Sequence, residues 1–286
     1  MRIVSLLPAA TDIVAELGLL EHLVGRTHEC DWPAEVASVP VVTSTGIDQN
    51  TLSSREISAT VHHGSSLYGL DTDLLNDLKP DVILTQDLCD VCAISYEKVS
   101  ETVRLMDVGP KVLSLEPSTL DEVLDCLRTV GDTLGVDSND KIASLHHRID
   151  HVEQQTRTLE HPRVAAIEWL DPVWPAGHWV PEQIAKAGGV PLIAAKGEHT
   201  TPITWQTVHD ANPDVVLLIP CGFPPERTLK ELPDQRFPET WVLDGPSYYN
   251  RPGPRVVRGI EILANVLHDI GPAPEPGEAL KLAPWT

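Results

Sequence analysis

Short runs of hydrophobic residues alternate along the chain with longer segments in which hydrophobic residues recur every three or four positions. The short runs predict buried strands, and the longer segments predict amphipathic helices. The strands are expected at 3–7, 23–27, 82–86, 112–115, 164–169, 215–219 and 240–243, and the helices at 11–17, 94–106, 120–134, 181–187 and 255–267. Strands that alternate with helices are typical of a parallel sheet covered on both faces, so the pattern predicts the α/β class.

A longer helix is predicted between Ser138 and Glu160. Its hydrophobic residues form one narrow stripe and stop before Pro162. They are Ile142, Leu145, Ile149, Val152 and Leu159. Because the strand and helix pattern occurs before this helix and again after it, we expect two Rossmann-like lobes with parallel sheets. The lobes are expected at 1–136 and 162–286, joined by one long α-helix at 137–161.

Two regions lack a clear pattern. Residues 43–71 are polar and contain several glycines, which predicts a long loop with at most one helical turn. The tail from Gly271 is rich in proline and is expected to be loosely docked.

The charge of the chain excludes some partners. With 21 basic and 42 acidic residues, the formal net charge is -21. Such a chain repels phosphate backbones and anionic lipid, which excludes nucleic acid and membrane surfaces as partners. A membrane-spanning helix needs about eighteen consecutive apolar residues, and the sequence contains no such run. The first residues do not read as a signal peptide, because Pro8 and Asp12 break the apolar run. We therefore expect a cytoplasmic protein.

Several segments, taken in order, resemble one known family. They are RIVSLLPAATDIVAELG at 2–18, CDWP at 30–33, LKPDVIL at 78–84, ITWQTV at 203–208, NPDVVLL at 212–218 and SYYNRPGPRVV at 247–257. The chain resembles the cobalamin-binding, BtuF-type members of the substrate-binding proteins with a rigid inter-lobe helix, a group that also includes siderophore and haem binders. The resemblance covers nearly the whole chain. It implies a class III periplasmic-binding-protein-like fold and a flat macrocyclic ligand in the inter-lobe cleft.

The resemblance also implies ligand contacts at matching motif positions. They would be Glu29, Trp32, Gln86, Trp174, Trp205, Tyr248, Tyr249, Asn250 and Arg251. Three departures from the family pattern bear on the ligand. Gln86 stands where an aromatic residue is expected, Cys30 replaces a small hydroxyl residue, and Arg251 is the one familiar charge left before the last helix.

Aromatic usage points to a flat ligand independently of the resemblance. The chain has 7 Trp and 2 Phe, and Trp169, Trp174 and Trp179 follow one predicted strand. Tryptophan offers a large apolar face with one hydrogen-bond donor, which suits an extended ring system. The alternative is that these rings cover the core of their own lobe. Glu168 and Asp171 flank Trp169 and either bind amides of a ligand or serve as caps and ion-pair partners.

Four of the five cysteines follow predicted strands: Cys30, Cys89, Cys92 and Cys221. Strand ends of parallel sheets form ligand sites, so one hypothesis is a shared metal site. Thiolates suit zinc or an iron-sulfur cluster, and also the cobalt of a corrinoid. A redox pair at Cys89 and Cys92 and four unliganded thiols are the alternatives. Cys126 lies within an amphipathic helix and is expected in the core.

Three histidines lie in loops near strand ends: His28, His178 and His199. Neutral imidazole is a good ligand for zinc or for a macrocyclic metal. His178, between Gly177 and Trp179, is the histidine that we include in the predicted metal site. The alternative for each is a surface or hydrogen-bonding role.

The sequence contains no familiar catalytic motif, so no catalytic residue is assigned and an enzyme is not favoured. We expect a protein that binds cobalamin or another corrinoid, or a related metal chelate, in the inter-lobe cleft. The alternative is a metalloprotein or enzyme with zinc or an iron-sulfur cluster on the cysteines, and a CxxC oxidoreductase is a third reading. A permease partner is not expected without an export signal.

Overall fold

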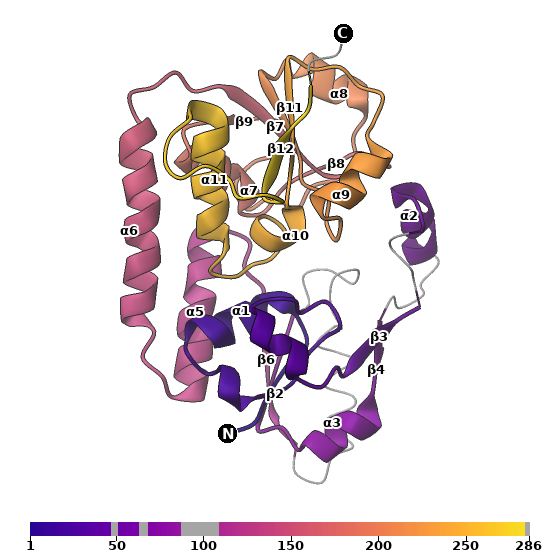
Figure 1. The fold of residues 1–286 in the computed structure, drawn as a ribbon, viewed down its shortest axis with the longest axis vertical. Helices are drawn as coiled ribbons and strands as arrows, with labels where there is room; N and C mark the ends of the chain where they lie inside the picture. Colours follow the sequence, from indigo (N-terminus) through magenta and orange to yellow (C-terminus); the bar gives the residue numbers. More distant parts are fainter. Residues whose placement is uncertain (47–50, 63–67, 87–108, 284–286) are drawn as a thin grey trace. The chain divides into compact units, whose positions relative to one another are not determined.

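The computed structural model describes residues 1–46, 51–62, 68–86 and 109–283. The chain forms two compact units (Figure 1). Unit 1 comprises residues 1–48, 59–116 and 126–141, and unit 2 comprises residues 49–58, 117–125 and 142–286. The helix predicted at 94–106, together with Cys89 and Cys92, lies outside the described residues. The domain boundaries predicted at 136 and 162 stay a prediction.

Unit 1 contains a parallel sheet with the strand order β2-β1-β5-β6. Its strands are β1 (Ile3–Ser5), β2 (Leu23–Gly25), β5 (Val82–Thr85) and β6 (Lys111–Ser114). Its α-helices include α1 (Pro8–Glu16) and α3 (Thr72–Leu78). Short 3-10 helices occupy Leu20–His22 and Ala34–Ser38, and β3 (Thr43–Thr45) pairs antiparallel with β4 (Tyr68–Leu70).

One hydrophobic core cluster of unit 1 lies between its sheet and α3. Val4 and Ile83 occupy neighbouring positions on β1 and β5 and pack with Leu75 of α3. All three side chains are fully buried. Removing such side chains from water is the main favourable term in folding, so this apolar layer fixes the sheet that carries the unit 1 loops.

Unit 2 contains a larger sheet with the order β12-β11-β10-β7-β8, and β9 also pairs with β7. The strands are β7 (Arg163–Trp169), β8 (Trp174–Pro175), β9 (Val190–Pro191), β10 (Val215–Leu218), β11 (Glu239–Leu243) and β12 (Ala279–Lys281). The helices are α6 (Asn139–Thr156), α7 (Val180–Lys186), α8 (Trp205–Asp210), α9 (Pro225–Thr228), α10 (Gly245–Tyr248) and α11 (Val256–His268), with a 3-10 turn at Leu229–Glu231.

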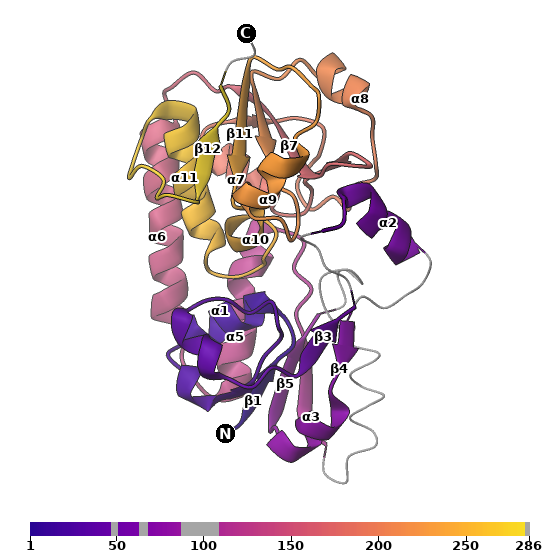
Figure 2. The same ribbon diagram turned by 45° about the vertical axis from the view of Figure 1, so that its right-hand side comes forward.

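The central strands β7, β10 and β11 of unit 2 are parallel, so their carboxyl ends lie at the same edge of the sheet. In both views α6 and α11 lie on one side of this sheet and α8 on the other (Figure 2). Ile167, Val216 and Val242 come from the three central strands and pack with Val208 of α8. Ligands bind beyond the carboxyl ends of such strands, which makes this edge the place to look for a site.

These findings confirm the predicted α/β class with parallel sheets. The helix α5 (Leu120–Leu134) has the predicted bounds, and α6 is the predicted long helix with its stripe buried at Ile142, Leu145, Ile149 and Val152. The first residues of α5 belong to unit 2 and the last to unit 1.

The prediction of a long loop at 43–71 was wrong. The segment contains β3, β4 and the helix α2 (Ser54–His62). A capping box starts α2: the backbone N–H of Ser53 donates to a Glu56 carboxylate oxygen (2.8 Å), and the Glu56 N–H donates to the Ser53 hydroxyl (3.3 Å). The spacing Ser-x-x-Glu was visible in the sequence.

The prediction of a loosely docked tail was also wrong. The strand β12 pairs antiparallel with β11, with Leu280 opposite Val242. Arg258 of α11 also donates to both carboxylate oxygens of Glu278, at 3.1 and 2.6 Å. The prediction rested on the proline-rich composition of the tail. It missed the short edge strand β12, because that strand is held by its pairing with β11. Among the described helices, none is long and apolar enough to cross a membrane.

Candidate ligand-binding site

An aromatic pair lies at the carboxyl edge of the unit 2 sheet. Trp169 ends β7, and Phe223 follows β10, which is next to β7. Their ring centroids are 5.0 Å apart, with an angle of 42° between the planes. Phe223 is fully buried, whereas Trp169 is partly exposed. The buried ring therefore supports the exposed one, which leaves one indole available at the edge of the sheet.

A buried arginine packs against this pair. The guanidinium carbon of Arg227 lies 4.1 Å from the centroid of the Phe223 ring. The same side chain is 7 % exposed and donates to a Glu231 carboxylate oxygen at 2.8 Å and to the carbonyl oxygen of Leu52 at 2.6 Å. The cation is stabilised by an ion pair and an aromatic face together, as a buried charge requires.

Residues 51–58, which we call the docked segment, belong to unit 2 although they precede it in sequence. The Ser54 N–H donates to Glu231 at 2.8 Å, and the Ser54 hydroxyl bonds the same carboxylate. Trp169 donates its indole N–H to the Ser58 hydroxyl at 2.8 Å. The sequence prediction missed this segment, because a run of polar residues was read as a loop. Its capping box was the available signal.

The end of β11 carries a second group of polar and aromatic residues. Asp244 caps α10 by accepting from the Ser247 N–H at 3.1 Å. Burial raises the pKa of Asp244, although its hydrogen bonds with Ser247 act in the opposite direction. Gly245 is required here, because a Cβ would lie 2.5 Å from the carbonyl oxygen of Ile219. This close approach holds the end of β11 against the end of β10.

The predicted contacts at 248–251 differ in exposure. Tyr248 is half-buried beneath Arg255, whose guanidinium carbon lies 4.8 Å from the ring centroid, and burial raises the pKa of the Tyr248 phenol. Tyr249 is fully buried and donates its hydroxyl to the carbonyl oxygen of Gly259 at 3.1 Å. Asn250 is partly exposed, and Arg251 is 7 % exposed. Tyr248 and Asn250 are thus the members of this group with accessible surface.

The other predicted tryptophans have different surroundings. Trp174 pairs with Trp169 across β7 and β8 and is partly exposed. Trp179 is buried and donates its indole N–H to the carbonyl oxygen of Tyr249 at 2.8 Å. Trp205 begins α8 and lies 6.2 Å from the Phe237 ring on the core face of the sheet. The core reading fits the buried Trp179, whereas Trp169, Trp174 and Trp205 are each partly exposed.

The strand ends of unit 1 present hydroxyls and a thiol. Cys30 is 3 % exposed, and its sulfur lies 3.0 Å from the Thr11 hydroxyl and 3.1 Å from the Thr27 hydroxyl. Thr11 also donates to Ser5 at the end of β1. Cys126 is buried in α5, as predicted.

The remaining predicted residues of unit 1 are His28, Glu29 and Trp32, which follow β2, and Gln86, which follows β5. His28 bonds the Thr43 hydroxyl through Nδ1 at 2.7 Å, and burial lowers the pKa of its imidazole. Glu29 donates its N–H to the Thr27 hydroxyl at 3.2 Å. Trp32 is partly exposed, and Gln86, just after β5, is 6 % exposed.

The predicted metal site stays a prediction. Cys221 is partly exposed and its N–H donates to the carbonyl oxygen of Glu168 at 2.9 Å, but Cys89 and Cys92 lie outside the described residues. Within the described ranges, no group of three or more His, Cys, Asp or Glu is placed to hold a metal ion. His178 lies beside His199, with ring centroids 5.3 Å apart. Burial, and then the neighbouring His199, lower the pKa of His178.

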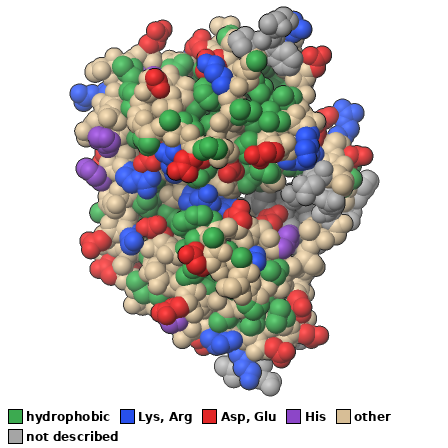
Figure 3. Space-filling model, viewed as in Figure 1, with side chains coloured by type: hydrophobic (Ala, Val, Ile, Leu, Met, Phe, Trp, Pro, Cys, Tyr) green, Lys and Arg blue, Asp and Glu red, His purple; other side chains and the backbone are tan. Residues whose placement is uncertain are grey.

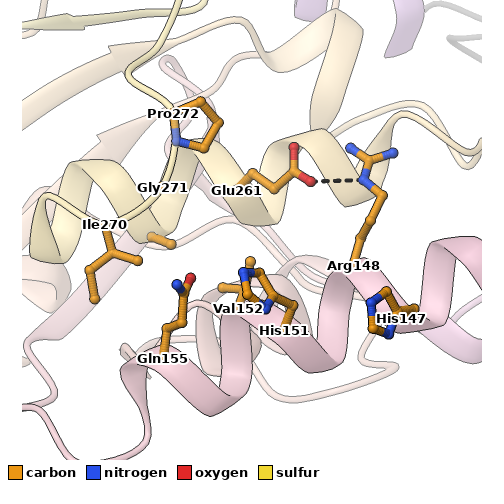
Figure 4. Close-up of a pocket in the computed structure, with 10 residues that line it drawn as sticks. His147, Arg148, His151, Val152, Gln155, Glu261, Ile270, Gly271 and Pro272 are labelled. Carbon is orange, nitrogen blue, oxygen red and sulfur yellow. Dashed lines mark hydrogen bonds and ion pairs between the residues drawn. The ribbon is translucent and has the colours of Figure 1, made fainter.

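A cavity of about 260 Å³ lies between α6 and α11 of unit 2 (Figure 4). Its ion pair joins Arg148 of α6 to Glu261 of α11 at 2.8 Å. His147 and His151 lie one turn apart on α6 and also line it. The arginine is already neutralised by the glutamate, so the cavity offers no free charge of Arg148 to an anionic ligand.

Acidic and basic side chains are interspersed on the face drawn in Figure 3. The net charge of -21 is therefore not gathered there into one acidic patch.

The chain is similar to proteins that are described as binding vitamin B12 or heme. It is 22% identical over 284 residues to a vitamin B12-binding protein of Vibrio cholerae, covering 93% of this chain and 88% of the relative. The crystal structure of the periplasmic vitamin B12-binding protein BtuF of Vibrio cholerae gives a TM-score of 0.65 at 19% identity, covering 92% of this chain and 95% of the other. The crystal structure of the periplasmic heme-binding protein RhuT of Roseiflexus gives a TM-score of 0.64 at 22% identity, covering 94% of this chain and 98% of the other. The structural likenesses confirm the fold predicted from the sequence.

These similarities overturn the predicted location. The two solved relatives are periplasmic proteins, and periplasmic proteins are exported from the cytoplasm. The prediction of a cytoplasmic protein was therefore wrong. It rested on the reading of the first residues, which is weaker than a match over almost the whole chain.

A profile of one family matches residues 3–235, and its description is periplasmic binding protein. The match includes the strands of unit 1 and the strands β7 to β10 of unit 2. It covers far more than half of the chain. The protein therefore belongs to the family of periplasmic binding proteins.

Proposed function

We propose that this protein binds a corrinoid or a closely related metal-bearing macrocycle, and that unit 2 supplies aromatic contacts to it. The observation that carries the proposal is the supported indole of Trp169 at the carboxyl edge of the unit 2 sheet. A partly exposed indole held by a buried ring offers a rigid apolar surface at low entropic cost, which suits a flat ring system.

The carboxyl edge of the same sheet also carries polar groups. Tyr248 and Asn250 follow β11, which β10 separates from β7, and both keep accessible surface. A corrinoid carries amide groups around its rim, and hydroxyl and amide side chains are suitable hydrogen-bond partners for them. The similarity to a vitamin B12-binding protein supports a corrinoid over other macrocycles.

The similarity to a heme-binding protein supports a second ligand of the same class. Haem is also flat and apolar, but its propionates are anionic. Two cations of unit 2 are already paired, Arg227 with Glu231 and Arg258 with Glu278, and the net charge of the chain is -21. An uncharged rim of amides therefore suits this surface better than two carboxylates.

Calorimetric titration of the full chain with cyanocobalamin, cobinamide and hemin tests the proposal. We expect saturable binding of one corrinoid per chain at micromolar concentration or below, tighter than hemin. Cobinamide lacks the lower nucleotide, so equal affinity for it would place the contacts on the corrin ring. No heat with either corrinoid at about 100 μM, corresponding to about -5.5 kcal/mol, would contradict the proposal.

Transporter coupling is part of the same proposal. The periplasmic location of the relatives removes the reason for not expecting a permease partner. We propose that the loaded protein docks on a membrane permease, which a pull-down with ligand-loaded and ligand-free protein tests. Equal recovery of a permease by both forms would contradict ligand-dependent delivery.

A further inference from the structure

Two loops of unit 2 hold a pair of histidines in fixed positions. The N–H of His178 donates to the carbonyl oxygen of Glu198 at 2.9 Å, and the Gly197 N–H donates to the His178 carbonyl oxygen at 2.8 Å. Thr200 adds a third link, because its hydroxyl donates to the Pro175 carbonyl oxygen at 2.8 Å. These bonds join residues 175–178 to residues 197–200 on both sides of the two imidazoles.

The backbone at His178 is unusual. Its φ of 52° lies in the left-handed region, which a residue other than glycine seldom adopts. The preceding Gly177 is also fixed, since a Cβ there would lie 2.3 Å from the Glu198 carbonyl oxygen. Strained backbone of this kind persists where the surroundings hold it, and it is concentrated at functional sites.

The two rings have the separation expected of a shared metal ion. Their centroids are 5.3 Å apart and their planes make an angle of 72°. Two imidazoles that bind one tetrahedral ion through bonds of 2.0–2.1 Å have centroids about 5.2 Å apart. The separation of the two rings therefore matches that of two imidazoles bound to one ion.

One nitrogen of the pair has no other use among the described residues. Nδ1 of His178 is buried and has no hydrogen-bond partner there. A buried polar atom without a partner is costly, so such atoms often mark an ion or ligand. His199, in contrast, is exposed. The pair is thus open on one side, which gives an ion access and leaves coordination positions for other donors.

We propose that His178 and His199 form a two-imidazole site for a divalent transition metal ion, with its remaining positions open to water or to a donor of a bound ligand. Imidazole selects zinc, nickel, cobalt and copper over magnesium and calcium, which prefer oxygen. The site goes beyond the proposed binding of a corrinoid, because it takes the ion alone.

Titration of chelator-treated full chain with Co²⁺, followed by its visible absorption, tests the site. We expect one Co²⁺ per chain with weak ligand-field bands and no strong sulfur-to-metal absorption. His178→Asn keeps a residue that tolerates the left-handed region, and His199→Ala changes an exposed side chain. Each is expected to weaken binding about tenfold or more, since each removes half of the protein ligands.

The matched control is the second histidine pair of unit 2. His147 and His151 lie one turn apart on α6 and line the cavity there (Figure 4). The double variant His147→Ala/His151→Ala is expected to leave Co²⁺ affinity within about twofold. Loss of binding in this control, unchanged binding in both His178→Asn and His199→Ala, strong thiolate absorption, or no Co²⁺ binding by the wild type would overturn the proposal. None of these results depends on whether the chain binds cobalamin.

Discussion

The strand ends of the two units differ in the chemistry that they present. In unit 1 they carry small hydroxyls around a buried thiol, Cys30. In unit 2 they carry rings and cations, with Trp169, Phe223 and Arg227 in contact. Both edges come from parallel sheets, so the difference lies in the loops and not in the fold. The same kind of sheet therefore carries small polar side chains at its edge in unit 1 and aromatic side chains at its edge in unit 2.

The largest expected effect is a loss of stability when an aromatic residue in the core of unit 2 is removed. Tyr249 is fully buried, so Tyr249→Ala is expected to lower the free energy of unfolding by about 3–5 kcal/mol. Tyr249→Phe keeps the ring and loses the bond to Gly259, which predicts a loss of about 1 kcal/mol. Urea denaturation of both variants measures the difference. Equal, small losses would show that Tyr249 is not a core residue.

The next effect concerns the docked segment. Glu231→Ala removes the carboxylate that Ser54 and Arg227 share, and is expected to cost about 2 kcal/mol and to expose residues 51–58 to hydrogen exchange. The control is Arg55→Ala, whose ion pair with Asp171 is exposed and is expected to contribute less than about 0.5 kcal/mol. Faster exchange in the control than in Glu231→Ala would contradict this account of docking.

A third prediction compares thiols of the two edges. Cys221 of unit 2 is partly exposed, whereas Cys30 of unit 1 is 3 % exposed. Alkylation of the native protein, mapped by mass spectrometry, is expected to modify Cys221 at least about tenfold faster than Cys30. Buried Cys126 is the internal reference for a protected thiol. Equal alkylation rates at Cys30 and Cys221 would contradict the claim that the thiol of unit 1 is more protected than the thiol of unit 2.

The smallest effect is a pH dependence at the end of β11. Burial raises the pKa of Asp244 above 3.8, so the folded state holds that proton more tightly than the unfolded state does. Ionisation of Asp244 therefore lowers stability as pH rises through the folded pKa, and has no effect well below 3.8. Asp244→Asn keeps an oxygen that caps Ser247. It is expected to raise stability slightly at pH 7 but not at pH 3; the opposite pattern in thermal unfolding would contradict the burial argument.

The sequence predicted the regular parts of both units better than the site. Buried strands such as β10 and the stripe of α6 follow from hydrophobic period alone. The docked segment was missed because its contacts are to Glu231 and Arg227, more than 170 positions away, and no local pattern encodes them. The ligand contact predicted at Trp205 from a motif stays a prediction, and the partly exposed ring of Trp205 has its centroid 6.2 Å from that of Phe237. A motif places a residue on an element but does not say which face it covers.

The central claim is that the supported indole of Trp169 carries ligand affinity. The most direct test is the ratio of cyanocobalamin dissociation constants for Trp169→Ala and the wild type, measured beside Trp205→Ala. Trp205 begins α8, packs against the core cluster of the same unit and is the matched tryptophan. We predict at least about tenfold weaker binding for Trp169→Ala, about 1.4 kcal/mol, and less than about twofold for Trp205→Ala. Equal affinity of Trp169→Ala and the wild type would contradict the account.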